Sequence, residues 1–218
     1  MTVEAPKPPR EPELEDDLRA VGAEELLRER RADDAELAGL VLGAAELHNL
    51  RLRRVALRSA ELAESTLRGA DFGEVVVTDG SWANAAAEQS TLAVVLARGL
   101  RATGVGLGDA RLADCTFADC RLDLASFRGA TLDRVAFLDC RLDEADFRGA
   151  TLRSVRFERC VLTGADLQQA HLERCELRGC ELGGLHGVER LRGARLPWPD
   201  VVQIAGLLAA ATGIEIVD

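Results

Sequence analysis

The sequence predicts an all-β solenoid, a parallel β-helix with four sides, that ends in a C-terminal capping α-helix. Three observations predict it. A large apolar residue recurs every five residues over most of the chain, a small residue precedes it by two positions, and longer blocks of 20 residues repeat almost unchanged. A period of five fits neither the 3.6-residue period of a helix nor the two-residue period of a strand, and such self-similarity is typical of stacked repeats.

The five-residue period extends from Leu37 to Leu182. Of the 30 positions reached in steps of five, 25 are Leu or Phe, and the position two residues earlier is Ala, Cys, Val or Ser in 26 of the 30. One residue separates the large and the small side chain, so both point to the same side of a short extended segment. The other two positions are rich in Arg, Asp, Glu and Gly, which suits a turn.

The 20-residue period indicates four sides per coil. Residues 119–138 and 139–158 match at 14 of 20 positions. Because 20 residues are four pentapeptides, residues 20 apart are expected to stack at the strand spacing of about 4.8 Å. The prediction places Phe117, Phe137 and Phe157 in one stack and Phe127 and Phe147 in another.

The pentapeptides resemble those of the pentapeptide-repeat family. In that family a small Ala comes first, the second position is often Asp or Asn, and the central position is Leu or Phe. This chain has the pattern in Ala70-Asp71-Phe72, Ala145-Asp146-Phe147 and Ala165-Asp166-Leu167. The resemblance covers residues 35–186 and implies a right-handed quadrilateral β-helix. In this chain Asp precedes the central residue at only three of the 30 repeats, and Arg takes the place at Arg51, Arg101, Arg111, Arg121, Arg141 and Arg156.

Three segments are expected. Residues 1–34 form an acidic, Pro- and Glu-rich tail, disordered over 1–13, in which residues 14–33 suit a short helix that caps the first coil through Leu26 and Leu27. Residues 35–186 form the β-helix. Residues 187–218 form the C-terminal cap, with a helix at about 199–212, because the five-residue pattern stops after Gly187 and two prolines follow.

The predicted C-terminal helix has two interpretations. Its apolar residues include Val201, Ile204, Leu207 and Leu208, more than one capping face requires. It either folds back on residues 185–196 as a simple cap or presents its wider face to a second copy of the chain. Some pentapeptide-repeat proteins dimerise through C-terminal elements, so the resemblance implies a homodimer as the second option.

The stretch from Trp82 to Ala102 is degenerate, with Ala at several central positions. It is either a run of regular coils with a thinner core or a functional loop. The five-residue frame is unchanged from Leu67 to Leu107, and loops usually break register, so the frame favours regular coils. Trp82 is then expected to fill space left by smaller neighbours.

Composition and charge exclude several classes of protein. The net charge is −10, of which −6 lies in residues 1–36 and −3 in the repeat region, and there is no Tyr among few aromatics. Direct binding to nucleic acid is therefore not expected. The chain has no 18-residue apolar run, and its N-terminus lacks the apolar stretch of a secretory signal. The expectation is a cytoplasmic protein that does not contact membrane.

No residue pattern indicates catalysis, a metal site or a cofactor. All six cysteines fall on the small inward position, with Cys120, Cys140, Cys160 and Cys180 at intervals of 20. A ladder with one cysteine per coil lacks the convergence that a metal site needs, so buried thiols are expected. Arg101, Arg121 and Arg141 are expected to stack with aspartates beside them as a salt-bridged face. The chain is therefore predicted not to be an enzyme.

The resemblance implies function through protein–protein interaction. Some pentapeptide-repeat proteins, among them the quinolone-resistance type, are DNA mimics that bind DNA gyrase and inhibit the enzyme or protect it from drugs. The acidic residues expected to form such a partner surface are Asp119, Asp123, Asp139, Asp143, Glu144, Asp146 and Asp166. The alternative is a structural scaffold for an unrelated protein partner, which the mixed Arg and Asp rows favour.

Overall fold

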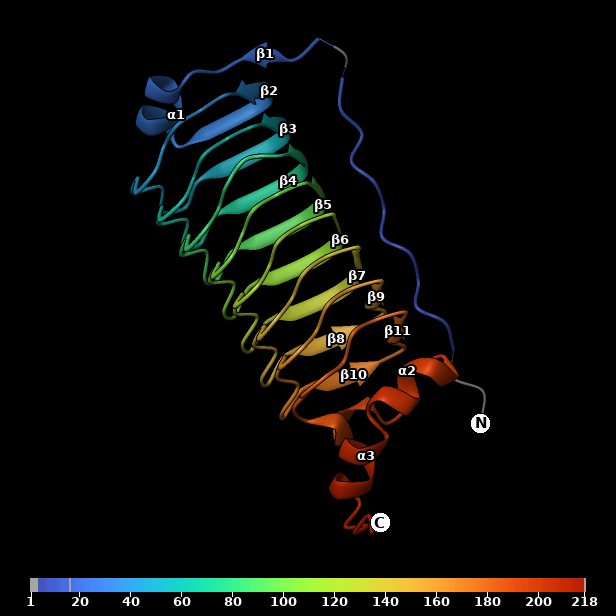
Figure 1. Cartoon of the computed structure of the whole chain (residues 1–218). Coiled ribbons are helices and arrows are strands. Elements are labelled where there is room, and N and C mark those ends of the chain that lie inside the picture. The colour runs from blue at the N-terminus through green and yellow to red at the C-terminus, as the bar shows by residue number, and fades with distance from the viewer. Residues whose placement is uncertain (1–3, 16, 218) are drawn as a thin grey trace.

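The computed structural model describes residues 4–15 and 17–217, and it confirms the predicted parallel solenoid. Figure 1 shows a rod of stacked coils with the N-terminal segment along one side and helices at the far end. Within the described residues eleven strands form one parallel sheet. They are β1 (Arg19–Ala20), β2 (Arg31–Ala38), β3 (Arg51–Arg58), β4 (Asp71–Thr78), β5 (Thr91–Arg98), β6 (Arg111–Ala118), β7 (Thr131–Leu138), β8 (Thr151–Arg153), β9 (Arg156–Glu158), β10 (His171–Glu173) and β11 (Glu176–Arg178).

Each coil has four sides, which we name from the coil 51–70. Face A is residues 51–53, face B is 55–58, face C is 60–63 and face D is 65–68, together with the residues 20 apart in other coils. The long strands cover faces A and B, and isolated bridges such as Glu61↔Ser81 and Thr66↔Ala86 join faces C and D. Corner residues such as Arg54 take a left-handed conformation, with φ of +50°. The coil therefore turns without interrupting the ladders.

The interior is filled by the predicted large residues. Phe137 stacks between Phe117 and Phe157, with ring centroids 5.2 and 5.1 Å apart, and Phe127 stacks on Phe147 at 4.8 Å. The two stacks meet edge-on, at 5.8 Å between Phe127 and Phe137. The stacking prediction is confirmed, and the rings leave no open channel at these coils.

Residues 82–102 are regular coils, as the frame favoured. β5 pairs with β6 in the same register, with Leu92 opposite Leu112. The Trp82 side chain is buried, and its ring centroid lies 5.5 Å from that of Phe72. Trp82 thus occupies interior space beside small residues such as Ala102, which is also buried.

The N-terminal end is closed by α1 (Ala23–Glu29) and by β1, which pairs with β2. Leu26 is buried as expected, but Leu27 is 44% exposed, so its predicted contact is wrong. One face of this two-turn helix lies on the first coil, and adjacent residues on a helix point about 100° apart. The solenoid begins with β2 at Arg31, slightly before the expected boundary at residue 35.

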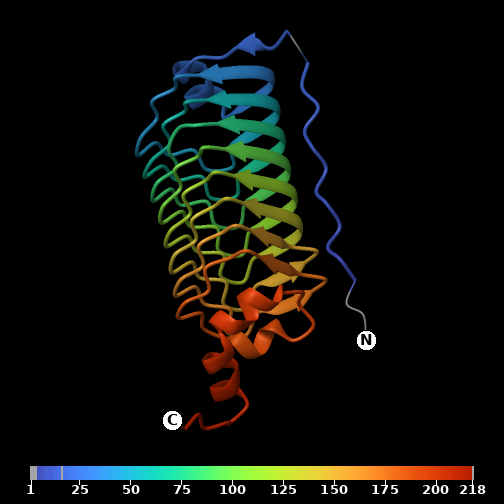
Figure 2. The same ribbon diagram turned by 45° about the vertical axis from the view of Figure 1, so that its right-hand side comes forward.

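Residues 4–15 run extended along the outside of the rod, from its C-terminal end towards its N-terminal end (Figures 1 and 2). Arg10 donates hydrogen bonds to Asp114 from its backbone N–H (3.2 Å) and its side-chain Nε (3.1 Å). The expectation of disorder over residues 1–13 is therefore wrong for residues 4–13, because these contacts fix the segment. Residues 1–3, part of the same expectation, lie outside the described residues.

The C-terminal end carries a 3-10 helix, η1 (Val188–Leu191), and two α-helices, α2 (Trp198–Gln203) and α3 (Ala205–Ala211). The expected single helix at 199–212 is thus broken at Ile204, whose φ is −108°. Ile204 is buried at this break, and Gly206, a weak helix former, follows it. Within the described residues no helix is long and apolar enough to span a membrane.

Side chains of α2 cap the last coil. The backbone N–H of Gly179 donates to the buried Asp200 carboxylate at 2.6 Å. Gln203 accepts from the N–H of Leu182 at 3.3 Å and donates to the carbonyl of Cys180 at 3.1 Å. Exposed strand edges otherwise present unpaired backbone groups, so these two side chains end the solenoid.

Replacing Phe137 by Ala is expected to lower the free energy of unfolding by about 3–5 kcal/mol. The ring is fully buried between two stacked neighbours, so its removal leaves a cavity. Urea unfolding followed by circular dichroism measures the change. The exposed-site control Leu124→Ala should stay within about 0.5 kcal/mol of wild type. Equal losses in the two variants would contradict the proposed core.

Candidate interaction surface

The outward row of face C carries the predicted arginine ladder. Arg101, Arg121 and Arg141 lie in register through parallel bridges, and their neighbours in the same row are Ser81 and Val161. Arg101 reaches past Ser81 to Glu61, with Nη2 3.2 Å from Oε1. Arg101 is therefore paired with a carboxylate two coils away in the same row.

Asp123 and Asp143 share one arginine beside this ladder. Arg141 lies 3.3 Å from Asp123 through Nε and 3.1 Å from Asp143 through Nη2. Partial burial, with the nearby Asp123 carboxylate, raises the pKa of Asp143 above its usual range. Two carboxylates thus compete for one guanidinium, which leaves this part of face C more acidic than the ladder alone suggests.

Four of the predicted acidic residues gather at one surface cleft of about 670 Å³. Asp143, Glu144, Asp146 and Asp166 line it, together with Arg148. Arg148 Nη2 is 2.6 Å from Asp146, and its Nε is 3.6 Å from Asp166. The hydrogen bond from Arg148 lowers the pKa of Asp146. We call this site the acidic cleft; it spans the corner between faces C and D.

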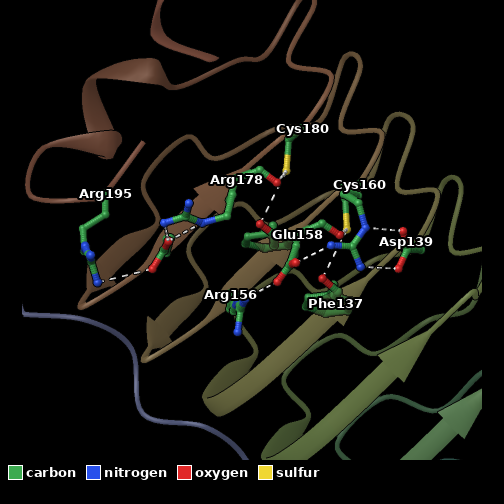
Figure 3. Close-up of polar contacts among 11 residues, drawn as sticks. Phe137, Asp139, Arg156, Glu158, Cys160, Arg178, Cys180 and Arg195 are labelled. Atoms are coloured by element: carbon green, nitrogen blue, oxygen red, sulfur yellow. Dashed lines mark hydrogen bonds and ion pairs between the residues drawn. The ribbon is translucent and has the colours of Figure 1, made fainter. Parts of the chain in front are cut away.

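Asp119 and Asp139 lie on another corner, between faces B and C, and do not line the acidic cleft. Arg159 holds Asp139 through two hydrogen bonds of 2.7 Å, which lower the pKa of that carboxyl (Figure 3). Asp119 occupies the equivalent corner one coil earlier, also with positive φ. The seven predicted residues therefore form two groups, with Asp123 stacked one coil before Asp143.

The cysteine ladder is part of the core. Figure 3 shows the thiols of Cys160 and Cys180 directed at backbone carbonyls of the preceding coil, 3.3 Å from Phe137 and 3.5 Å from Phe157. All six cysteines are buried free thiols, and burial raises the pKa of Cys115 to about 12. Among residues 4–15 and 17–217, no three His, Cys, Asp or Glu side chains converge as metal ligands would.

The C-terminal helices and η1 enclose an apolar groove of about 450 Å³. Val201, Ile204 and Leu208 line this cap groove, so the structure brings these predicted residues together. Leu207 lies outside it and is 36% exposed. Two further apolar side chains on α2 are exposed, Trp198 at 76% and Val202 at 55%.

A buried ion pair anchors the N-terminal segment, and sequence reasoning missed it. Asp114, whose side chain is 1% exposed, accepts hydrogen bonds from Arg134 at 2.7 and 2.9 Å as well as from Arg10. The Arg134 guanidinium lowers the pKa of Asp114 to about 2 despite its burial. The Asp114–Arg134 pair could have been found from its 20-residue spacing, but no repeat relates Arg10 to it.

We expect the stability that Asp114 provides to be lost at low pH. Its pKa is lower in the folded chain than the ordinary value of about 3.9, so protonation favours the unfolded chain. Its contribution, about 2 kcal/mol, is fully present above pH 4 and disappears as the pH falls through about 2. Denaturant unfolding of wild type and Asp114→Asn should therefore differ near neutral pH and converge towards pH 2.

The control for this pH series is Asp79→Asn. Asp79 occupies a corner with a similar positive φ, and no ion pair involves it among the described residues. Its replacement should leave the unfolding free energy nearly unchanged at every pH. A wild-type advantage over Asp114→Asn that is the same at pH 2 and pH 7 would contradict the assignment.

Comparisons with known proteins agree with the repeat pattern. The family described as pentapeptide repeat region matches residues 110–186. A search of curated proteins found no match. Among solved structures, a trypsin-treated QnrB1, a plasmid-mediated fluoroquinolone resistance protein, aligns with a TM-score of 0.45 and 14% identity, over 85% of this chain and 100% of that chain.

Two cyanobacterial proteins are also similar. HetL, a pentapeptide repeat protein involved in heterocyst differentiation regulation from Nostoc sp. strain PCC 7120, has a TM-score of 0.30 and 21% identity over 83% of this chain and 98% of its own. Rfr23 from Cyanothece 51142 has a TM-score of 0.24 and 15% identity, over 79% of this chain and 91% of its own. The matched pattern continues in the same register on the N-terminal side of residue 110, through β2 to β5. Residues 110–186 are therefore similar to the pentapeptide-repeat family.

Proposed function

We propose that this chain is a non-enzymatic protein that acts by binding another protein. The observation that carries the proposal is the acidic cleft, where Asp143, Glu144, Asp146 and Asp166 gather around one arginine. The filled core keeps the side chains of successive coils at a fixed spacing of about 4.8 Å, so the cleft is preorganised for a partner. Charged rows of this kind give a partner its register and specificity.

We propose DNA gyrase as the first partner to test. A DNA mimic competes for a positively charged channel, and the excess of carboxylates at the acidic cleft supports such competition. The arginine ladder and the pairing of Asp123 and Asp143 with Arg141 favour the alternative, a scaffold for an unrelated protein. We also propose the cytoplasm as the compartment, which six free thiols support.

We further propose that the cap lets two copies of the chain associate. Ile204 is buried against the core, but Trp198, Val202 and Leu207 remain exposed beside the cap groove. Apolar side chains gathered at one end of a solenoid are candidates for an interface. The C-terminal helices would then act both as a cap and as a dimer surface. The side chains of α2 cap the last coil, and the exposed face of the helices is available to a second copy.

If gyrase is the partner, the protein should inhibit gyrase supercoiling or protect it from a quinolone. The double variant Asp143→Lys/Glu144→Lys should weaken that effect by at least about tenfold, because each change reverses a charge at the acidic cleft. The matched control is Glu64→Lys, since Glu64 occupies the same corner row as Glu144 with a similar backbone conformation. Absence of both inhibition and protection, with no binding to gyrase, would reject gyrase and leave the scaffold.

If the cap forms a dimer, sedimentation velocity at micromolar concentration should give a dimer for wild type and a monomer for Val202→Glu/Leu207→Glu. Both side chains are exposed, so the changes leave the last coil capped. The control Val41→Glu alters an equally apolar residue, 75% exposed, on face C of the first coil and should remain dimeric. A monomeric wild type would refute the dimer.

A further inference from the structure

The outward row of face B differs from the other three rows. It has no charged residue over five consecutive coils, whereas the outward rows of faces A, C and D in those coils include charged residues such as Asp71, Arg101 and Asp146. The residues of the face B row are Ala56, Val76, Leu96, Thr116 and Ala136. Although this row points away from the core, Leu96 is only 9% exposed and Ala136 only 6%. Part of this apolar stripe is therefore covered, while Val76 and Thr116 in the same row remain partly exposed.

The N-terminal segment provides that cover over β6 and β7. Ala5, Pro6, Lys7, Pro8 and Pro9 face Thr116 and Ala136 across a shared cleft. Both ribbon views show the segment following the rod axis beside the strands (Figures 1 and 2). We call residues 4–13 the strap.

The strap is fastened by charge at one edge of face B. Arg10 binds Asp114, and Glu4 lies 3.8 Å from Arg174, three coils further along the same corner row. Glu11 and Glu13, however, lie with Glu74 around another cleft and have no compensating base in its lining besides Arg10. Like charges there weaken the part of the strap that follows Arg10 in the sequence.

The strap does not fill the cleft between it and the strands of face B. The cleft between Ala5–Pro9 and the strands has a volume of about 740 Å³, and its floor includes Ala136, Leu138 and Arg156. Permanently buried side chains in protein interiors pack about as densely as small organic molecules in crystals. The strap presents Ala5, three prolines, Lys7 and Glu11 to this wide cleft and no large apolar side chain, so a sequence with bulkier apolar side chains would gain contacts.

We propose that face B is a docking groove for an extended, proline-containing segment of a partner protein. The segment carries an arginine that reaches Asp114 and larger apolar side chains over Thr116 and Ala136. The strap occupies the groove in the free protein, and the partner displaces it. This inference rests on the proposed function only in that the chain works by binding proteins; it does not depend on gyrase or on the acidic cleft.

The chemistry of the groove selects this partner. The buried Asp114 carboxylate already accepts a hydrogen bond from the Arg10 guanidinium, and a guanidinium binds carboxylates in a directed, charge-assisted way. Proline-containing segments dock on flat apolar surfaces at low cost in conformational entropy, because they are already extended. The strap competes from a tethered position, so its high effective concentration raises the apparent Kd of any segment offered in solution.

The test is fluorescence anisotropy with labelled peptides of residues 4–13 and the full-length protein. The variant Arg10→Glu, whose own strap lacks its anchor, should bind the peptide at least about tenfold more tightly than wild type. A peptide carrying Lys7→Leu, which adds an apolar side chain beside the cleft, should bind more tightly than the natural peptide. A peptide carrying Arg10→Glu should not bind.

The groove is tested in the Arg10→Glu background. Adding Ala136→Arg should abolish peptide binding, and the fold accepts Arg at this position because Arg156 occupies it one coil later. Adding Thr131→Arg, which copies Arg111 on face A, should leave binding unchanged.

Three results would overturn the proposal. The first is no peptide binding to the Arg10→Glu protein. The second is equal binding by the Ala136→Arg and Thr131→Arg variants. The third is a wild-type dimer that Arg10→Glu dissociates in sedimentation, since the occupant would then be the strap of a second copy. Because none of these readouts involves gyrase, the outcome is independent of the supercoiling assay.

Discussion

Hydrogen bonding between coils sets the 20-residue register on which the remaining structure depends. Each backbone ladder, as in Leu62 N–H donating to the Ser81 carbonyl at 2.7 Å, requires the chain to turn a corner at fixed positions. Even Val94 takes a left-handed φ of +58° at such a corner, a conformation that β-branched residues rarely adopt. The ladders on both sides of the corner outweigh that local cost. Once the backbone is fixed, the inward rows must be apolar, and the outward rows become free to carry function.

The same constraint leaves an unpaired edge at each end of the rod, and the two ends solve it differently. At the N-terminal end β1 extends the sheet and Leu26 of α1 packs against the core. At the C-terminal end Asp200 and Gln203 satisfy backbone groups with side chains. Because α2 is held by those polar contacts and by Ile204, its remaining apolar residues are not needed for capping. The exposed apolar face is thus a consequence of a cap that relies on hydrogen bonds.

What could be predicted from the sequence follows from what repeats. The Phe stacks, the arginine ladder and the regular coils over 82–102 all depend on residues related by 20 positions, and each was confirmed. The contacts that were missed occur once: Arg10 on Asp114, the orientation of Leu27, and the helix break at Ile204. The acidic residues fall between these cases, because the repeat predicts their rows, but it does not show that a corner separates Asp139 from the acidic cleft.

The surface that a partner meets depends on where the strap lies. Residues 1–36 carry −6 of the total charge of −10, and the strap places part of that charge beside Glu74 on the rod. Displacing the strap would therefore expose an apolar stripe and remove carboxylates from the corner between faces A and B. The acidic cleft lies on the corner between faces C and D, on the other side of the rod, and keeps its charge. Charge-based binding at the cleft and segment binding on face B thus use separate residues, so a substitution at Ala136 and one at Glu144 can be expected to act independently.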